Sequence, residues 1–120
     1  MQKELRDVVA YIAGRLVLDN TVNFIYSFED GVHLQYSGEV TSDRVNVYDN
    51  QMGNFITGNK NGDKFSLYHY SIGNFTDLTI IESTFKGYDY ASGQFYDGKI
   101  NGNLINLYDY EDGNFHEYRL

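Results

Sequence analysis

The sequence of 120 residues contains no cysteine, no proline and no tryptophan. Without cysteine the chain cannot form a disulfide, a thiolate metal site or a cysteine nucleophile. The absence of proline, together with 12 glycines, 12 tyrosines and 8 phenylalanines, favours β-strands joined by tight glycine turns over helices. The composition is therefore typical of a mainly β protein.

Long hydrophobic runs are also missing. Charged residues interrupt the first 20 positions, so no signal peptide is predicted, and no later stretch has the length of a membrane-spanning helix. We therefore expect a cytoplasmic protein without membrane partners. The net charge of −8, with no run of basic residues, opposes binding to the phosphates of nucleic acids or to anionic membranes.

A 20-residue repeat dominates the sequence that is present. Glycine recurs four times at this spacing. Each glycine has a tyrosine upstream in the same repeat, and a phenylalanine follows it two residues later. These glycines are Gly53, Gly73, Gly93 and Gly113. A weaker copy around Tyr26 and Gly31 precedes them. We expect residues 1–120 to form a single domain, with a helix in residues 1–13 and a β-repeat region in residues 14–120.

Each repeat has the pattern of a β-hairpin, with two strands and two turns. The dipeptides Asn61-Gly62 and Asn101-Gly102 are typical of two-residue type I′ turns, in which both central residues take a positive φ. The segment that ends at Gly113 is typical of a four-residue loop that closes on a left-handed glycine. The pattern predicts an antiparallel β-meander of about five hairpins.

Placing the Asn-Gly dipeptides at the centres of their turns aligns one tyrosine and one phenylalanine of every repeat in a single row across the sheet. The row consists of Tyr48, Phe55, Tyr68, Phe75, Tyr88, Phe95, Tyr108 and Phe115. In this register Phe95 lies opposite Tyr108, and Tyr108 lies opposite Phe115. The row is the candidate interaction surface, because exposed contiguous aromatic side chains mark contact sites. The alternative is that the row belongs to a second buried face.

The other face of the predicted sheet collects aliphatic side chains such as Val47 and Leu107, and we expect it to be the core face. An amphipathic helix that includes Leu5, Val8 and Ile12 at helical spacing should lie on it. A helix of about 12 residues is about 18 Å long, whereas eight strands span about 40 Å. The rest of that face must be covered by curling of the sheet, by a second layer or by another copy of the chain.

An in-register repeat supplies almost none of the stagger that closes a β-barrel. The sequence therefore favours a wide, open, twisted sheet. The alternative is a β-solenoid with one 20-residue repeat per coil, because apolar residues also recur every five positions. The units GNFTD, STFKG and GQFYD resemble those of pentapeptide-repeat proteins, and this resemblance implies the solenoid.

A second resemblance concerns the stretch INGNLINLYDYEDGNF, which is similar to the hairpin repeats of choline- and glucan-binding cell-wall proteins. It implies hairpins like those inferred from the turns. The tryptophans of that family are missing here, so the resemblance assigns no ligand-binding residue to this chain.

No constellation of residues indicates catalysis or a bound metal. The three histidines, His33, His69 and His116, lie far apart in the sequence and lack the spacing of a zinc motif. Glycine-rich phosphate loops and nucleophile motifs are also missing. The sequence predicts no enzyme, no catalytic residue, no cofactor and no metal ligand.

The function predicted from these features is that of a non-enzymatic binding or assembly module that acts through the faces of its sheet. Self-association into a homo-oligomer, or contact with another protein, is the leading interpretation, because the predicted sheet is wider than its helix can cover. Binding of a glycan on the tyrosine and phenylalanine row is the alternative. A third hypothesis, based on the net charge, is an acidic inhibitor that mimics nucleic acid.

Overall fold

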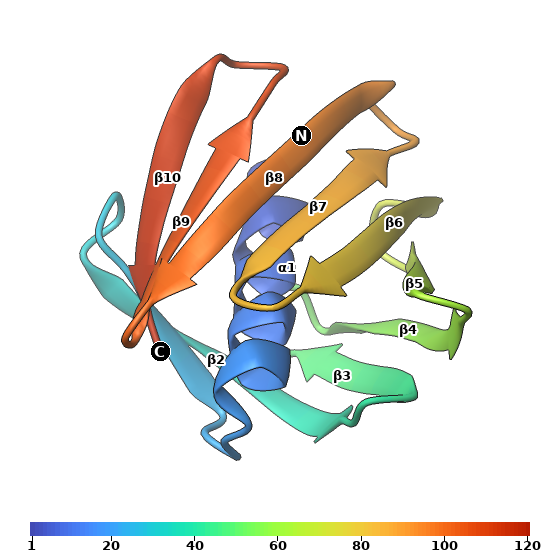
Figure 1. Cartoon of the computed structure of the whole chain (residues 1–120), viewed down its shortest axis with the longest axis horizontal. Coiled ribbons are helices and arrows are strands. Elements are labelled where there is room, and N and C mark those ends of the chain that lie inside the picture. The colour runs from blue at the N-terminus through green and yellow to red at the C-terminus, as the bar shows by residue number, and fades with distance from the viewer.

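The computed structural model describes residues 1–120 and contains one helix and ten strands (Figure 1). The helix α1 spans Lys3–Leu18. The strands are β1 (Phe24–Ser27), β2 (Val32–Val40), β3 (Arg44–Asp49), β4 (Asn54–Asn61), β5 (Lys64–His69), β6 (Asn74–Ile81), β7 (Thr84–Asp89), β8 (Gln94–Asn101), β9 (Leu104–Asp109) and β10 (Asn114–Arg119). The helix lacks the length and the apolar character that spanning a membrane requires.

The strands form a closed antiparallel barrel. Each strand pairs with its neighbours in the sequence, and β10 pairs with β1. The predicted meander of hairpins is thereby confirmed. The predicted open, twisted sheet is wrong, because the last strand pairs with the first and closes the sheet. The alternative solenoid is wrong as well, because the strands of each repeat pair with each other in antiparallel hairpins.

The stagger that closes the barrel arises in the two-residue turns. Asn101 is the last residue of β8 and pairs with Leu104, so Gly102 is the first central residue of the turn and not the second. Gly102 has a φ of +58°, while Asn103 has no positive φ. This is the pattern of a type II′ turn. The turn after Asn61 has the same placement.

Moving a turn by one residue moves the pairing of its strands by two. Lys86 lies opposite Asp97, and Asp97 lies opposite Tyr108, which is 22 residues beyond Lys86. Because the sequence repeats every 20 residues, each of these repeats advances two residues along the barrel. The accumulated advance contributes the stagger that closure requires. A shift of two residues leaves every side chain on its predicted face.

Helix α1 runs through the middle of the barrel (Figure 1). Ten consecutive residues, Leu5 to Gly14, are all buried, whereas a helix lying on an open sheet would expose one side. The helix continues to Leu18, past its predicted end at residue 13. Gly14 lets the barrel wall approach closely, because a Cβ at this position would lie 2.8 Å from Cδ1 of Ile105.

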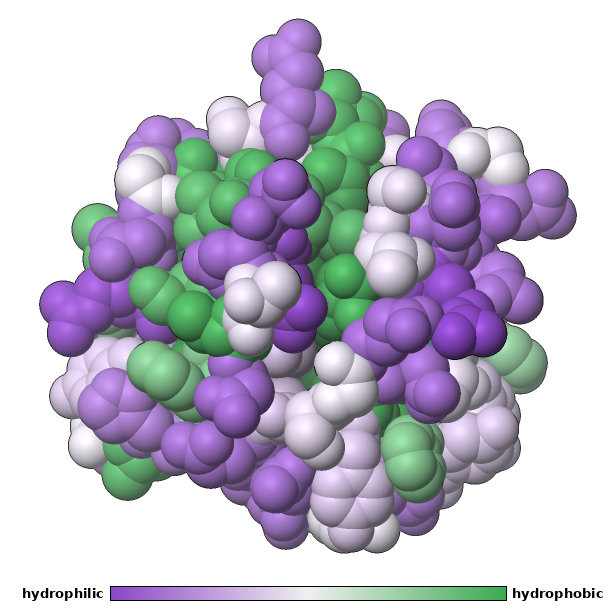
Figure 2. All heavy atoms as spheres, turned by 90° about the horizontal axis from the view of Figure 1, so that it is seen from below, coloured by the Kyte–Doolittle hydropathy of each residue, from purple (hydrophilic) through white to green (hydrophobic).

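The predicted core face lines the inside of the barrel. Val47 and Leu107 are almost fully buried, and one cluster of 23 buried hydrophobic residues joins the helix to the strands. At the C-terminal end of the helix, Leu16, Val17 and Leu18 are partly buried against this cluster. Figure 2 looks at the molecule from below and shows apolar atoms in the middle of this end, with polar side chains around them.

The opposite mouth of the barrel is built by the four-residue loops. The residue before three of these loops is an aspartate, Asp49, Asp89 or Asp109, whose Oδ1 accepts a backbone N–H of its loop. In the loop after β5, Nδ1 of His69 accepts the N–H of Ile72 at 3.3 Å. All four side chains are buried. The polar residue that follows the repeat tyrosine therefore closes its own loop from inside the barrel.

Enclosure of the helix predicts that its two sides are equally intolerant of charge. Ala10 lies opposite the predicted apolar stripe and is fully buried, so Ala10→Glu would place an unpaired carboxylate in the core. We expect the free energy of unfolding, measured by urea denaturation, to fall by about 3 to 5 kcal/mol. The exposed Ala91→Glu in the loop after β7 should change it by less than about 0.5 kcal/mol. Equal effects of both substitutions would contradict the enclosed helix.

His69 predicts acid sensitivity of the fold. Burial lowers the pKa of His69 by more than the carboxylates of Asp49 and Glu4 raise it. Below about pH 6.5 His69 takes up a proton in the unfolded chain but not in the folded one. The free energy of unfolding therefore decreases as the pH falls, by at most about 1.4 kcal/mol per pH unit. His69→Asn removes this titration and keeps an acceptor for the loop.

The measurement is the free energy of unfolding of both proteins between pH 7.5 and 5. The advantage of the wild type over His69→Asn should shrink as the pH falls through this window. Two parallel profiles would show that His69 does not contribute to the pH dependence.

Candidate functional site

The eight residues of the predicted aromatic row all lie on the outer wall of the barrel. They form four pairs, in each of which a tyrosine lies directly opposite a phenylalanine on the adjacent strand. The ring centroids of the pairs are 4.7 to 5.0 Å apart, in edge-to-face contact. These are favourable aromatic geometries. The four pairs of the row are therefore as predicted.

The pairs do not join into one row. The stagger of the barrel places Phe95 beside Tyr110 and not opposite Tyr108, and the N–H of Tyr110 donates to the carbonyl of Phe95 at 3.3 Å. The same contact joins Tyr70 to Phe55. The predicted row is thus divided into four clusters that step around the wall.

The outer wall is exposed. Phe95 and Phe115 show 63% and 66% of their surface to solvent, while the tyrosines of the four pairs are half-buried. Curvature of the sheet turns this face outward, so it does not become the second buried face that the sequence left open. It is instead the largest collection of exposed aromatic side chains on the molecule.

A second tyrosine completes three of the clusters. Tyr70, Tyr90 and Tyr110 each make an edge-to-face contact at 4.9 Å with the tyrosine two residues before them. The sequence contained the signal for these contacts, because residues two apart in a strand share a face. The predicted row omitted them since it followed only one tyrosine in each repeat.

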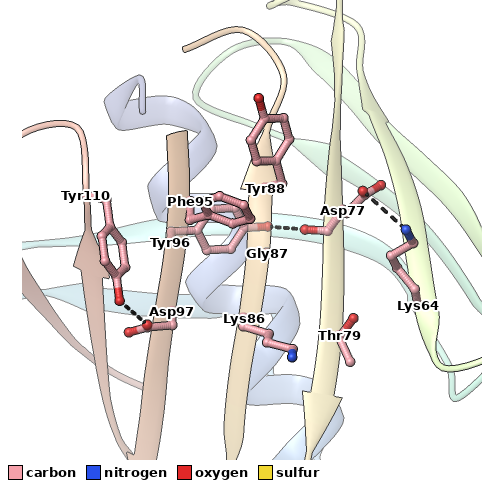
Figure 3. Close-up of a pocket in the computed structure, with 10 residues that line it drawn as sticks. All are labelled: Lys64, Asp77, Thr79, Lys86, Gly87, Tyr88, Phe95, Tyr96, Asp97 and Tyr110. Atoms are coloured by element: carbon pink, nitrogen blue, oxygen red, sulfur yellow. Dashed lines mark hydrogen bonds and ion pairs between the residues drawn. The ribbon is translucent and has the colours of Figure 1, made fainter. Parts of the chain in front are cut away.

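A groove of about 450 Å³ crosses the wall between two clusters (Figure 3). Tyr88 and Phe95 line it, and Gly87 leaves its floor without a side chain. Behind the glycine lies the ring of Tyr96, whose hydroxyl donates to the carbonyl of Asp77 at 2.8 Å. A Cβ on Gly87 would lie 2.3 Å from Cζ of that ring. The volume is in the range of small-molecule sites.

Two carboxylates stand at the groove, and each accepts a hydrogen bond from a tyrosine. The hydroxyl of Tyr110 donates to Oδ2 of Asp97 at 2.7 Å, and that of Tyr90 donates to Oδ2 of Asp77 at 2.8 Å. The hydrogen bond to Asp77 raises the pKa of Tyr90, and that to Asp97 raises the pKa of Tyr110. Both hydroxyls therefore keep their protons and orient the carboxylates.

Two lysines complete the lining. Nζ of Lys64 lies 3.5 Å from Oδ2 of Asp77, and Lys86 lies opposite Asp97 in the register. The groove thus combines aromatic rings with oriented carboxylates and ammonium groups, an arrangement that can bind a small ligand with apolar faces and several hydroxyls. The cluster of Tyr48 and Phe55 lacks such a carboxylate, because Thr57 occupies the position that Asp77 and Asp97 have in their repeats.

No protein-family model, no curated protein and no solved structure matches the chain. The geometry of the outer wall is therefore the basis for inferring function. Its useful elements are an exposed aromatic surface, a groove with a glycine floor, and carboxylates whose positions are fixed by neighbouring hydroxyls. These elements support recognition of a ligand in the groove between the clusters.

Proposed function

We propose that the protein is a non-enzymatic binding module whose outer wall binds a carbohydrate. The observation that supports this most directly is the groove at Tyr88 and Phe95, with Asp77 and Asp97 at its edges. The C–H faces of a sugar ring pack on aromatic side chains, which combine apolar area with defined geometry. Its hydroxyls donate to carboxylates in charge-assisted hydrogen bonds. The groove offers both kinds of contact within one small volume.

The contacts of the two carboxylates suit the recognition of a ligand. Asp97 and Asp77 each accept a tyrosine hydroxyl, and Asp77 also lies near the ammonium group of Lys64. One oxygen of each carboxylate is thereby held by a neighbouring donor, and the other oxygen can accept a hydroxyl group of the ligand. We therefore assign both aspartates to the recognition of hydroxyl groups.

The repeat also supports more than one contact with a glycan chain. The cluster of Tyr68 and Phe75 has its own carboxylate, Asp77, held by Tyr90. Two neighbouring clusters thus present the same groups to solvent. Linked weak sites bind an extended ligand more tightly than either site does alone.

The carbohydrate proposal predicts binding on a glycan array, followed by calorimetric titration of the best ligand. Tyr88→Ala combined with Phe95→Ala removes the aromatic contact and should weaken binding at least about 10-fold, since an aromatic contact contributes about 1 kcal/mol or more. Asp97→Asn should weaken it in the same direction.

The matched control is Tyr48→Ala combined with Phe55→Ala. This variant loses an equivalent aromatic pair from the cluster that has Thr57 in place of the aspartate, so the affinity should be retained. Thermal unfolding of both double variants monitors the fold. An array without hits, or equal loss of affinity in both double variants, would remove the proposal.

Self-association is a second candidate, supported by a different observation from the one that the sequence offered. The inner face of the sheet is filled by α1, so an uncovered core face is no longer a reason for a partner. The exposed rings of Phe95 and Phe115 give a different reason to expect a partner, because aromatic residues are enriched in protein interfaces. A second copy, or another protein, would then cover the outer wall.

This candidate predicts a concentration-dependent mass in sedimentation equilibrium at high micromolar protein. Phe95→Ser combined with Phe115→Ser should convert the assembly to a monomer and leave the thermal unfolding midpoint nearly unchanged, because both rings are exposed. A monomeric mass of the wild-type chain at these concentrations would exclude it.

A further inference from the structure

Four ionisable side chains meet at the mouth of the barrel where β10 pairs with β1. Nε2 of His116 lies 2.8 Å from Oδ2 of Asp112, and Nδ1 of the same ring lies 3.1 Å from Oε2 of Glu29. One oxygen of Asp109, one of Asp112 and a ring nitrogen of His116 lie within 4.8 Å of one another. These residues come from the last hairpin and from the loop between β1 and β2.

The repeat provides an internal control for this cluster. In the three repeats before the last one, the place of His116 is taken by Ile56, Thr76 and Tyr96, and the place of Asp112 by Met52, Ile72 and Ser92. None of these six has a carboxylate or an imidazole. The weaker first copy has Asp30 in the place of Asp112 but Leu34 in the place of His116, so no other copy combines the two groups and the repeat fold does not itself require the cluster. It occurs only at the seam of the barrel.

Asp109 contributes a buried carboxylate oxygen that has no hydrogen bond. Its side chain is 1% exposed, its Oδ1 accepts the N–H of Glu111, and its Oδ2 has no hydrogen-bond partner. The Arg6 guanidinium and the Met1 amine come within 3.6 and 3.5 Å of Oδ2 without making a hydrogen bond to it. Oδ2 of Asp109 is thus in ion-pair contact but keeps lone pairs that no donor occupies, which a metal ion can accept. Oδ2 of Asp89 also has no hydrogen bond, but only Asp109 has a second carboxylate and an imidazole beside it.

The charge balance at the mouth leaves room for such a cation. Glu29, Asp109 and Asp112 contribute three carboxylates, and Arg6 is in ion-pair contact with two of them. The carboxylates therefore outnumber the guanidinium, and a cation would offset the excess of negative charge. The amine of Met1 does not remove this excess, because it pairs with Glu111 as well as lying 3.5 Å from Oδ2 of Asp109.

We propose that Asp109, Asp112 and His116 bind a divalent transition-metal ion, with Zn²⁺ as the best-matched ion. One imidazole nitrogen and two carboxylate oxygens are a ligand set that zinc accepts, with water in the remaining position. Glu29 holds the other ring nitrogen of His116, as carboxylates do for metal-binding histidines. The ion would join the loop after β9 to β10 and, through Glu29, to the loop after β1.

The place of the site in the barrel indicates what the ion does. Strands β1 and β10 share two paired residues, Tyr26 with Arg119 and Ser27 with Tyr118, whereas β9 and β10 share six. The seam is therefore the shortest strand pairing of the barrel. All three ligands lie on the β10 side of the seam, and the contact between His116 and Glu29 crosses it, so an ion that fixes the ring of His116 would stabilise the closed form.

The test is the thermal unfolding of EDTA-treated protein titrated with Zn²⁺, together with Co²⁺ absorption. We expect the unfolding midpoint to rise by about 5 °C at a zinc concentration of about ten times Kd, and to keep rising with the logarithm of the zinc concentration. We also expect the d–d bands of Co²⁺ bound at one site per chain. His116→Gln and Asp112→Asn should each abolish both signals.

His33→Gln is the control, because it removes an exposed histidine of β2 that is not part of the cluster. It should retain both signals. Asp112→Asn keeps an oxygen that can accept the N–H of Asn114, so it remains a fair test even if His116→Gln does not fold. A wild-type chain without either signal, or signals of equal size in Asp112→Asn, would overturn the site. Glycan binding on the outer wall is a separate measurement and does not decide this result.

Discussion

Each two-residue turn fixes the pairing of the strands that it joins, and the architecture depends on where the glycine stands in that turn. With Gly102 at the first central position, β8 and β9 pair two residues out of step with the sequence repeat. The accumulated offset closes the sheet into a barrel. Closure in turn creates the space that α1 occupies, so the only large hydrophobic core of the chain follows from the geometry of its turns.

Filling the barrel with a helix determines where the protein can meet other molecules. The interior, which in many barrels holds a ligand, is taken up by α1 and by residues such as Leu67 and Tyr96. What remains is the outer wall and the two mouths. The wall has the exposed phenylalanines and the groove above Gly87. The mouth beside β10 has the cluster around His116. Both proposals therefore concern surfaces that a closed barrel cannot bury.

The sequence was sufficient to predict the hairpins and the two faces, because strand alternation has a period of two and survives a shift of two residues. Val47 is inside and Phe95 is outside in the predicted and the observed register alike. The predicted pairing of Phe95 with Tyr108 is wrong, because an Asn-Gly dipeptide fits a turn in more than one position, and Tyr108 pairs with Asp97 instead. The cluster at the seam was not predictable. Glu29 and His116 are 87 residues apart in the chain, and only closure brings them together.

The enclosed helix also limits how this chain could have changed its length by duplication. In an open solenoid a further repeat extends the array and leaves the earlier contacts intact. Here a sixth hairpin would widen the barrel, and the single helix would no longer touch the wall on all sides. Loss of one hairpin would leave too little room for Tyr11 and Ile12, which are buried against it now. The number of repeats is thus set by the girth of one helix, so sequence divergence within the existing five hairpins, as at Thr57 and His116, is the available route to new surfaces.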